Sequence, residues 1–414
     1  MNYTENNTGV KIASLDAEKA FDKVWRDGLF SKLIDKLDPV MWHILKIYYD
    51  SSRGTIDLGD GLLSDLFSIS FGVKQGGILS PSLFHAYIDD LIYCCTNSNI
   101  GAIFNKINVS IIVYADDIIL ISSVDSHLQK LLDICASYSD IWRLKFNSNK
   151  SNIVEFGKQF FENSNFYLNK KIIPKSDKIT YLGVIIDNKF NFNKNTIDKF
   201  SNVQKAIYSL SFLGLRPNSI SPHLQSFIYK TYCLSQFTYG IETTVLNKET
   251  RDYLNISQNN ILRQILGIHK YCHMSKILKC LKVFDLENLY VYSKLSFLKS
   301  IKQNVITSFI FSELCSSKRN RLSKSFVQDI KVLEKRFNSK IGDICLELDY
   351  FRKLVKRSFD LRDGIADSVN TCLINYKSKK FKNILDNLIK PDFLRQDEEF
   401  QELLQYLIIT DEYS

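Results

Sequence analysis

The sequence lacks the features that mark secreted and membrane proteins. No uninterrupted apolar run approaches the ~18–20 residues that a membrane-spanning helix needs, so no membrane partner is expected. The N-terminal stretch MNYTENNTGV is polar and has no apolar segment of the kind found in secretory signals. The nine cysteines include no Cys-x-x-Cys pair and are odd in number, which favours reduced thiols. Together these absences predict an intracellular protein of the cytoplasm, the nucleus or both.

What the chain does contain indicates a globular protein of more than one domain. Its 414 residues are enough for two or three domains, and 45% apolar and 13% aromatic residues are typical of a chain with a substantial core. The net charge of +9 favours a polyanionic partner, although many proteins without one are equally basic. Residues 299–340 are rich in Lys and Arg, and either a solvated helical surface or a nucleic-acid track would explain them.

Periodicity divides the chain into a mixed N-terminal part and a helical remainder. Up to about residue 190 helices alternate with strands, which predicts an α+β fold with helices packed on a sheet. Beyond residue 194 the pattern is almost wholly helical, so we expect a domain boundary near 190. Ser80 is the expected N-cap of one helix, and Pro81 suits its first turn. The predicted strands are 10–16, 67–73 and 152–157, the predicted hairpins are 109–122 and 171–187, and the predicted helices are 39–50, 80–95 and 126–146.

Two adjacent carboxylates, Asp116 and Asp117, interrupt the apolar run IIVYADDIILIS at residues 111–122. Strand-forming residues lie on both sides, so the run predicts a β-hairpin with both aspartates at its tip. Two neighbouring carboxylates repel each other unless a cation lies between them, and Mg²⁺ takes such oxygen ligands. An ordinary hairpin with a solvated acidic turn is the alternative.

A third carboxylate in a suitable position is that of Asp16, which ends the predicted strand VKIASLD. Phosphoryl transfer by two metal ions uses carboxylates from separate strands, with the ions roughly 3.5–4 Å apart. One ion activates the attacking oxygen and the other stabilises the leaving oxygen. Asp16, Asp116 and Asp117 therefore predict a two-metal site.

Five motifs around these carboxylates resemble, in their order and spacing, the reverse transcriptase of non-LTR (LINE-type) retrotransposons. The wording Ala-Phe-Asp-Lys-Val in the first motif favours these elements over their near relatives, the group II intron maturases. A further stretch at 235–267 is similar to the region that follows the motifs in the same elements. The motifs are SLDAEKAFDKVW at 14–25, GVKQGGILSPSLFHAYIDDL at 72–91, VYADDIILIS at 113–122, NSNKSNIVEFG at 147–157 and ITYLGVIID at 179–187.

The resemblance implies both the fold and the reaction. The expected architecture is a polymerase right-hand palm (a sheet with packed helices) in 1–190, an all-α thumb in 191–290 and a helical, basic C-terminal region in 291–414. The expected activity is RNA-directed DNA polymerisation with two Mg²⁺ (or Mn²⁺) ions. The expected partners are an RNA template, a DNA primer and dNTPs, and no oligomeric state is implied.

The resemblance also implies which residues serve the reaction. Asp16, Asp116 and Asp117 would be the metal-binding triad, and the main-chain carbonyl of Ala17 would be a further ligand. Lys150 matches the lysine of the fourth motif, which would protonate or screen the pyrophosphate leaving group. A solvated surface lysine is the alternative for Lys150.

Nucleotide contacts are expected from the first and second motifs. Phe21 occupies the steric-gate position, where an aromatic ring crowds a ribose 2′-OH and selects deoxynucleotides; an ordinary core aromatic is the alternative. Gln75 would touch the incoming nucleotide or the template base, and Gly76 would let the backbone approach it. A plain turn is the alternative for this pair.

The fifth motif, Tyr181-Leu182-Gly183, resembles the primer grip, which holds the primer 3′ end in line for attack. A hairpin glycine with packing neighbours is compatible with the same task.

Three other aspartates are not expected in the metal site. Asp22 lies past the end of the strand, so it is expected to cap or pair locally. Asp89 and Asp90 imitate the catalytic doublet but fall in a predicted helix, where a solvated or capping role is expected.

One departure from the family lies before the first motif. Enzymes of this kind carry a fingers region there, and few residues precede Asp16 in this chain. We therefore expect a chain without fingers, taken from a larger open reading frame. The alternative to an active polymerase is a truncated, inactive relic that only binds nucleic acid.

Overall fold

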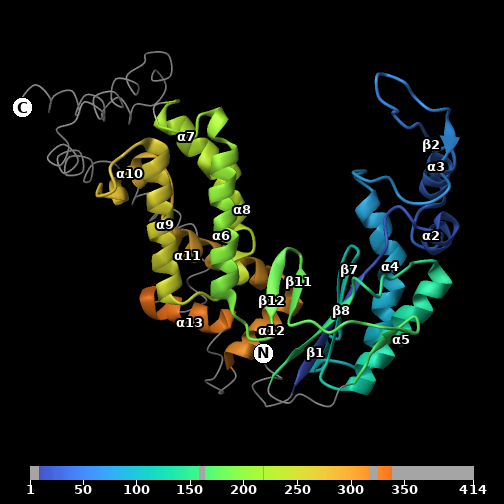
Figure 1. The fold of residues 1–414 in the computed structure, drawn as a ribbon. Helices are drawn as coiled ribbons and strands as arrows, with labels where there is room; N and C mark the ends of the chain where they lie inside the picture. The colour runs from blue at the N-terminus through green and yellow to red at the C-terminus, as the bar shows by residue number, and fades with distance from the viewer. Residues whose placement is uncertain (1–8, 158–163, 218, 317–324, 338–414) are drawn as a thin grey trace, which may run out of the picture. The chain divides into compact units, whose positions relative to one another are not determined.

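The computed structural model describes residues 9–157, 164–217, 219–316 and 325–337, which divide into two compact units at residue 190. The first unit contains helices and strands, and the second contains helices and, in its described residues, no strand (Figure 1). This mixed content agrees with the predicted α+β class. None of the described helices is both long and apolar enough to cross a membrane.

The first unit is built on a four-stranded antiparallel sheet with the strand order β6-β7-β1-β8. Its central strand β1 (Val10–Asp16) alternates between the two faces of the sheet, and Ala13 and Leu15 point into the larger core. The predicted strand at 10–16 is therefore confirmed. The other three strands are β6 (Ile111–Tyr114), β7 (Asp117–Ser122) and β8 (Asn152–Phe156).

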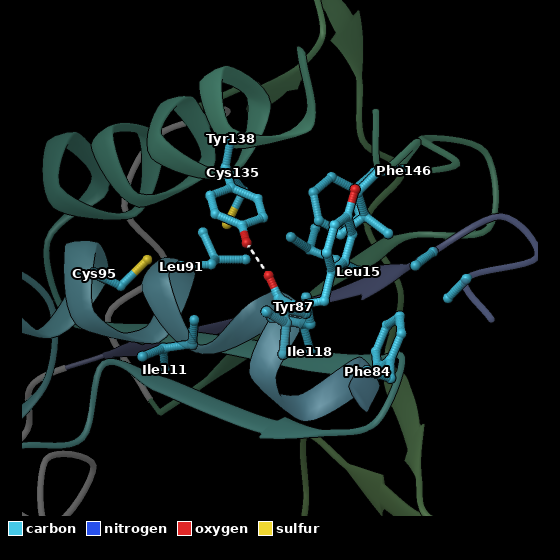
Figure 2. Packing of buried hydrophobic residues seen from close by; sticks show 14 of the residues in the cluster. Leu15, Phe84, Tyr87, Leu91, Cys95, Ile111, Ile118, Cys135, Tyr138 and Phe146 are labelled. Carbon is cyan, nitrogen blue, oxygen red and sulfur yellow. Dashed lines mark hydrogen bonds between the residues drawn. The ribbon is translucent and has the colours of Figure 1, made fainter. Parts of the chain in front are cut away.

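Two long helices, α4 (Ser80–Asn97) and α5 (Asp125–Trp142), cover one face of this sheet. Figure 2 shows their side chains packed against the strands, with the Tyr138 hydroxyl donating a hydrogen bond to the Tyr87 carbonyl. The helix predicted at 126–146 ends earlier, at Trp142, because Arg143 adopts a left-handed conformation with φ 55°.

The opposite face of the sheet is covered by a hairpin of β11 (Lys178–Tyr181) and β12 (Val184–Asp187). Its Ile179 lies in a small core with Ile119 and Val154 from the sheet. The strands β7, β1 and β8 are therefore covered on both faces, whereas Ile112 and Tyr114 of the edge strand β6 remain exposed.

The predicted hairpin at 171–187 is wrong in extent. Lys171–Ile172 (β10) pairs instead with Tyr167–Leu168 (β9). Between the two hairpins the chain turns to β8, where the Pro174 carbonyl accepts a hydrogen bond from the Ile153 amide. Proline has no amide to donate, which prevents one continuous ladder across this segment.

The segment between β1 and α4 is irregular. Helix α3 (Pro39–Asp50) is confirmed, and the Asp38 carboxylate caps it at the Val40 amide. The strand predicted at 67–73 is only two residues long, Phe67–Ser68. The remaining short elements of this unit are α2 (Arg26–Leu33), β2 (Arg53–Gly54), β3 (Phe67–Ser68), β4 (Ile103–Phe104) and β5 (Ile107–Asn108).

Ser80 is not the N-cap of α4, contrary to the prediction. Leu79 holds the cap position, and the Ser80 hydroxyl donates to the Lys74 carbonyl instead. The reason is that the tight turn before the helix brings this carbonyl next to Ser80.

The second unit is a helical assembly with its own core. Asn247 caps helix α9 at the Thr250 amide, and Gly267 ends it with φ 68°. The described elements are α6 (Phe192–Ser209), η1 (Ser211–Leu213), α7 (Pro222–Ile228), η2 (Tyr229–Leu234), α8 (Ser235–Thr238), η3 (Ile241–Thr243), α9 (Lys248–Leu266), α10 (Met274–Cys280), α11 (Leu286–Gln303), α12 (Val305–Ser316) and α13 (Phe326–Phe337).

The predicted division between 290 and 291 falls inside the continuous helix α11. Most of the predicted C-terminal region 291–414, including part of the basic segment 299–340, lies outside the described residues.

Candidate active site

Asp16 and Asp117 lie directly opposite each other at the end of the sheet. Asp16 is the last residue of β1, Asp117 is the first residue of β7, and the two are partners in the antiparallel register. Directly opposed residues project from the same face, with Cβ atoms about 4.5–5.5 Å apart. Since Leu15 and Ile118 point into the helix-covered core, the two carboxylates belong to the opposite face, which the β11–β12 hairpin covers.

Asp116 joins this pair from the turn between β6 and β7. Tyr114 pairs with Asp117, so Ala115 and Asp116 are the two turn residues. The prediction that both aspartates form the tip is wrong for Asp117, which already belongs to the strand. Ala115 has φ 52°, a left-handed conformation that costs a residue with a side chain about 1–2 kcal/mol.

The charges of Asp16 and Asp116 act on the carboxylate of Asp117. Asp117 keeps an exposed side, yet partial desolvation of its carboxylate raises its pKa, and the charges of Asp116 and Asp16 raise it further. Their oxygen atoms are the ligands that Mg²⁺ prefers, and a bound cation would relieve the repulsion. In the described part of the chain, however, no three His, Cys, Asp or Glu side chains already converge as a metal cluster.

The main chain around Asp16 is held on one side by the fourth motif. The Asn147 amide donates to the Asp16 carbonyl at 2.8 Å, and the Asp16 amide donates to the Ser151 hydroxyl at 3.2 Å. Successive carbonyls of an extended strand point to opposite sides. The Ala17 carbonyl is therefore directed away from Asn147, toward the side where the β6–β7 hairpin lies.

Lys150 lies in this same turn, between Asn147 and Ser151. Its side chain is exposed, and among the described residues its ammonium group makes no ion pair. The fold thus brings the turn that carries Lys150 next to Asp16, and this placement is compatible with a role at the leaving group and with a solvated surface lysine.

Phe21 is held between the first and second motifs. Its ring is half-buried and stacks on Phe84 with 4.7 Å between the ring centroids, while its carbonyl accepts a hydrogen bond from the Val73 amide at 2.8 Å. The ring thus packs against the core and keeps part of its surface accessible. This geometry is compatible both with a steric gate and with an ordinary core aromatic.

Gln75 and Gly76 are the central residues of a turn closed by a hydrogen bond from the Gly77 amide to the Lys74 carbonyl. Gly76 has φ 74°, a conformation that glycine adopts readily. The exposed Gln75 amide donates to the Asp22 carboxylate at 2.8 Å. Asp22 therefore pairs with a distant segment, not locally as predicted.

The β11–β12 hairpin brings Tyr181 toward the aspartates. Leu182 and Gly183 form its turn with φ 48° and 72°, the conformation of a tight two-residue hairpin. Burial raises the pKa of Tyr181, and the nearby charge of Asp117 raises it further. Figure 1 shows the β11–β12 hairpin on the side of the sheet away from α4 and α5. The register of Asp16 and Asp117 assigns the carboxylates to this same face.

Asp89 and Asp90 lie on α4 with half-exposed side chains, as predicted for solvated residues, and each also forms an ion pair. Asp89 pairs with Lys36 at 3.1 Å, and Asp90 pairs with Lys32 at 2.9 Å. These ion pairs attach helix α4 to α2 and the residues after it, which explains an acidic doublet outside the metal site.

Arg26 has a structural role that the sequence did not predict, and its side chain is buried. Its guanidinium donates to the carbonyls of Gly72 at 2.9 Å, Tyr49 at 2.6 Å and Ile69, and so holds together three segments of the irregular region. The signal that the sequence offers is an arginine directly after the apolar residues Val24 and Trp25.

Comparison with known proteins gives one family match. Residues 2–186 match the family described as reverse transcriptase (RNA-dependent DNA polymerase). The RNA-directed DNA polymerase from mobile element jockey of Drosophila melanogaster is 27% identical over 290 residues, which cover 67% of this chain and 31% of that protein. The Pol polyprotein of the type-2 retrotransposable element R2DM of the same species is 32% identical over 184 residues, which cover 42% of this chain and 17% of that protein. The chain thus spans about a third of the length of the curated relatives it matches, or less.

Solved telomerase structures are more distant. Telomerase from Candida tropicalis in complex with a fragment of telomeric RNA matches 83% of this chain and 49% of that chain at 12% identity, with a TM-score of 0.37. The Candida albicans complex matches 73% of this chain and 49% of that chain at 12% identity, with a TM-score of 0.33. Scores this low do not establish a shared arrangement of the parts.

Proposed function

We propose that this chain, whose residues 2–186 are a reverse transcriptase domain of the kind found in non-LTR retrotransposons, extends a DNA primer on an RNA template. The observation that carries the proposal is the pairing of Asp16 with Asp117 across two central strands, with Asp116 beside them. Under this proposal residues 1–190 are the palm and 191–290 the thumb.

The donor set fits two Mg²⁺ (or Mn²⁺) ions. Asp16, Asp116 and Asp117 would hold them, together with the Ala17 carbonyl that is directed to the same side. When bound, such ions neutralise charge on the attacking and leaving oxygens of a phosphoryl transfer. The protein contributes three carboxylates whose mutual repulsion favours a cation.

The remaining motif residues would select and orient the substrates. The partly accessible ring of Phe21 would exclude a ribose 2′-OH, and Gln75 with Gly76 would contact the dNTP or the template base. Lys150 would lower the charge on the departing pyrophosphate. Tyr181, on its hairpin, would hold the primer end in line for attack, since positioning supplies much of the catalysis in phosphoryl transfer.

Primer extension by the purified chain tests the proposal directly. The assay uses a DNA primer on an RNA template, labelled dNTPs, and Mg²⁺ or Mn²⁺. We expect incorporation by the wild type and none by Asp116→Ala, because the variant loses one metal-binding carboxylate. Asp140→Ala is the matched control, since Asp140 is exposed on α5, which covers the other face of the sheet.

Each alternative gives a different result in this assay. Incorporation by Asp116→Ala would refute the assignment of the carboxylates. RNA binding without incorporation by the wild type, at any metal concentration, would indicate a relic that only binds nucleic acid. Such binding would weaken with salt, because phosphate contacts release counterions.

A further inference from the structure

We infer that Asp22 is a positioning residue, which fixes the side-chain amide of Gln75 in the orientation that faces the nucleotide. The inference rests on the proposed function and adds a residue to it. Its starting point is the hydrogen bond from Gln75 Nε2 to Asp22 Oδ1 at 2.8 Å, between two residues that are far apart in the sequence.

This hydrogen bond belongs to a short ladder between two segments. The Val73 amide donates to the Phe21 carbonyl at 2.8 Å, and the Gly72 amide donates to the Val24 carbonyl at 2.9 Å. The segments 21–24 and 72–75 therefore run side by side. The pair of Asp22 and Gln75 adds a side-chain link where the second segment enters its turn.

The two segments approach so closely that only glycine fits at residue 72. A Cβ atom on Gly72 would lie 2.6 Å from the Asp22 carbonyl oxygen and 2.9 Å from its Cα, and the φ of 80° also favours glycine. Arg26 also fixes the backbone at Gly72, since its Nε donates a hydrogen bond to the Gly72 carbonyl. The backbone that carries Asp22 is thus fixed relative to the backbone that leads to Gln75.

The chemistry of the pair determines which atom Gln75 presents. An ionised carboxylate only accepts hydrogen bonds, so the amide nitrogen of Gln75 must face Asp22. The carbonyl Oε1 is left as the group available to a ligand, and among the described residues it accepts no hydrogen bond. Gln75 is thereby set to receive a hydroxyl or amino donor of a nucleotide.

The location of the pair suits this role. Asp22 and Gln75 lie at a cavity of about 640 Å³ whose lining also includes the cationic side chains of Arg53 and Lys74. Asp22 directly follows Phe21, the predicted steric gate. One rigid framework therefore carries both the ring and the amide.

Two variants of Asp22 separate hydrogen bonding from other effects. The Asp22→Asn variant still offers a side-chain oxygen to Gln75, whereas Asp22→Ala offers none. In primer extension we expect Asp22→Ala to raise the KM for dNTP by up to about tenfold, the equivalent of one charge-assisted hydrogen bond, with kcat little changed. Asp22→Asn should restore most of this loss, and Asp27→Ala, an exposed aspartate on α2, is the control.

Coupling between the two residues gives a sharper test. If Asp22 acts through Gln75, Asp22→Ala in a Gln75→Ala background should raise KM no further. Independent, multiplying effects of the two substitutions would overturn the inference. So would an unchanged KM in Asp22→Ala, or an Asp22→Asn variant as impaired as Asp22→Ala.

Hydrogen–deuterium exchange tests the positioning without any activity. We expect faster exchange of the amides at 74–79 in Asp22→Ala than in the wild type, and wild-type exchange in Asp22→Asn. Equal exchange in all three proteins would overturn the inference even if the enzyme is active. Failure of the wild type to extend primers would instead refute the proposed function, and the exchange result would still decide whether Asp22 holds Gln75.

Discussion

The Asp117 carboxylate is destabilised in its ionised form by its surroundings. Partial desolvation, then the charges of Asp116 and Asp16, raise its pKa above the ordinary value for aspartate. The folded protein therefore binds this proton more tightly than the unfolded chain does. Without metal, the stabilising effect of protonation is present below the unfolded pKa and is lost as the pH rises through the raised folded pKa.

We expect Asp117→Asn to stabilise the metal-free protein at neutral pH, because the variant removes the repelling charge. The increase should shrink as the pH falls through the raised pKa of Asp117, where the wild type is protonated as well. Thermal unfolding followed by circular dichroism at several pH values measures this. A lower melting temperature for Asp117→Asn at neutral pH would contradict the expected repulsion.

Metal addition should reverse the order of stability. A ligand at 100 times its Kd stabilises a protein by about 2.7 kcal/mol. We expect Mg²⁺ to raise the melting temperature of the wild type and to have a smaller effect on Asp117→Asn. Asp140→Asn is the control, and an equal Mg²⁺ effect on all three proteins would exclude Asp117 as a ligand.

At the scale of elements, Lys32 attaches helix α2 to α4 and α5. Its ammonium group is almost fully buried, pairs with Asp90 at 2.9 Å, and donates to the Tyr87 carbonyl at 2.6 Å and the Tyr138 hydroxyl at 2.7 Å. It also lies 3.6 Å from the centre of the Trp142 ring. Aromatic faces and carbonyl oxygens together replace the water that the cation loses.

Lys32→Ala should lower the free energy of unfolding by about 2–4 kcal/mol, because it leaves a cavity and removes the hydrogen bonds to the Tyr87 carbonyl and the Tyr138 hydroxyl. Lys36→Ala is the matched control, since the Lys36–Asp89 pair is exposed and such pairs contribute about 0–1 kcal/mol. Urea unfolding measures both values. Equal losses of unfolding free energy in the two variants would show that the aromatic surroundings of Lys32 do not contribute to stability.

Elements with a strong local pattern were predictable from the sequence. The strand β1 alternates between apolar and polar faces, and helix α3 begins with Asp38 and Pro39, so both were placed correctly. The predictions that are wrong concern segments whose structure depends on contacts with residues far away in the sequence. Pro174 joins β8 instead of continuing a hairpin, and Ser80 binds a carbonyl instead of capping its helix.

In the candidate site, too, local features were predictable from the sequence and contacts between distant segments were not. Local patterns drew attention to Asp16, Asp116 and Asp117, and resemblance to a family predicted their role, but no local pattern states that Asp16 and Asp117 are strand partners. The roles of Asp22 and Arg26 were missed, because their partners lie in a segment whose fold has almost no regular structure. Side-chain hydrogen bonds of this kind depend on the tertiary fold and leave little periodicity in the sequence.

At the scale of the whole molecule, the two units have separate hydrophobic cores. Leu120 is fully buried in the core between the sheet and α4 and α5, and Leu262 is buried in the core of the helical unit. Each core is assembled from residues of its own unit. Two cores of this size are expected to unfold as two cooperative transitions.

Single substitutions should therefore act on one transition each. Leu120→Ala and Leu262→Ala should each cost about 2–5 kcal/mol, since a buried leucine loses its contacts and leaves a cavity. For units of 150–250 residues this corresponds to a shift on the order of 5–15 °C in the affected transition. Differential scanning calorimetry of the full chain measures both. If each variant shifts a different transition, the two units are energetically independent. A variant of the helical unit that loses nucleotide binding would then show that this unit contributes to binding directly. If both variants shift one shared transition, folding of the helical unit stabilises the sheet that carries Asp16 and Asp117.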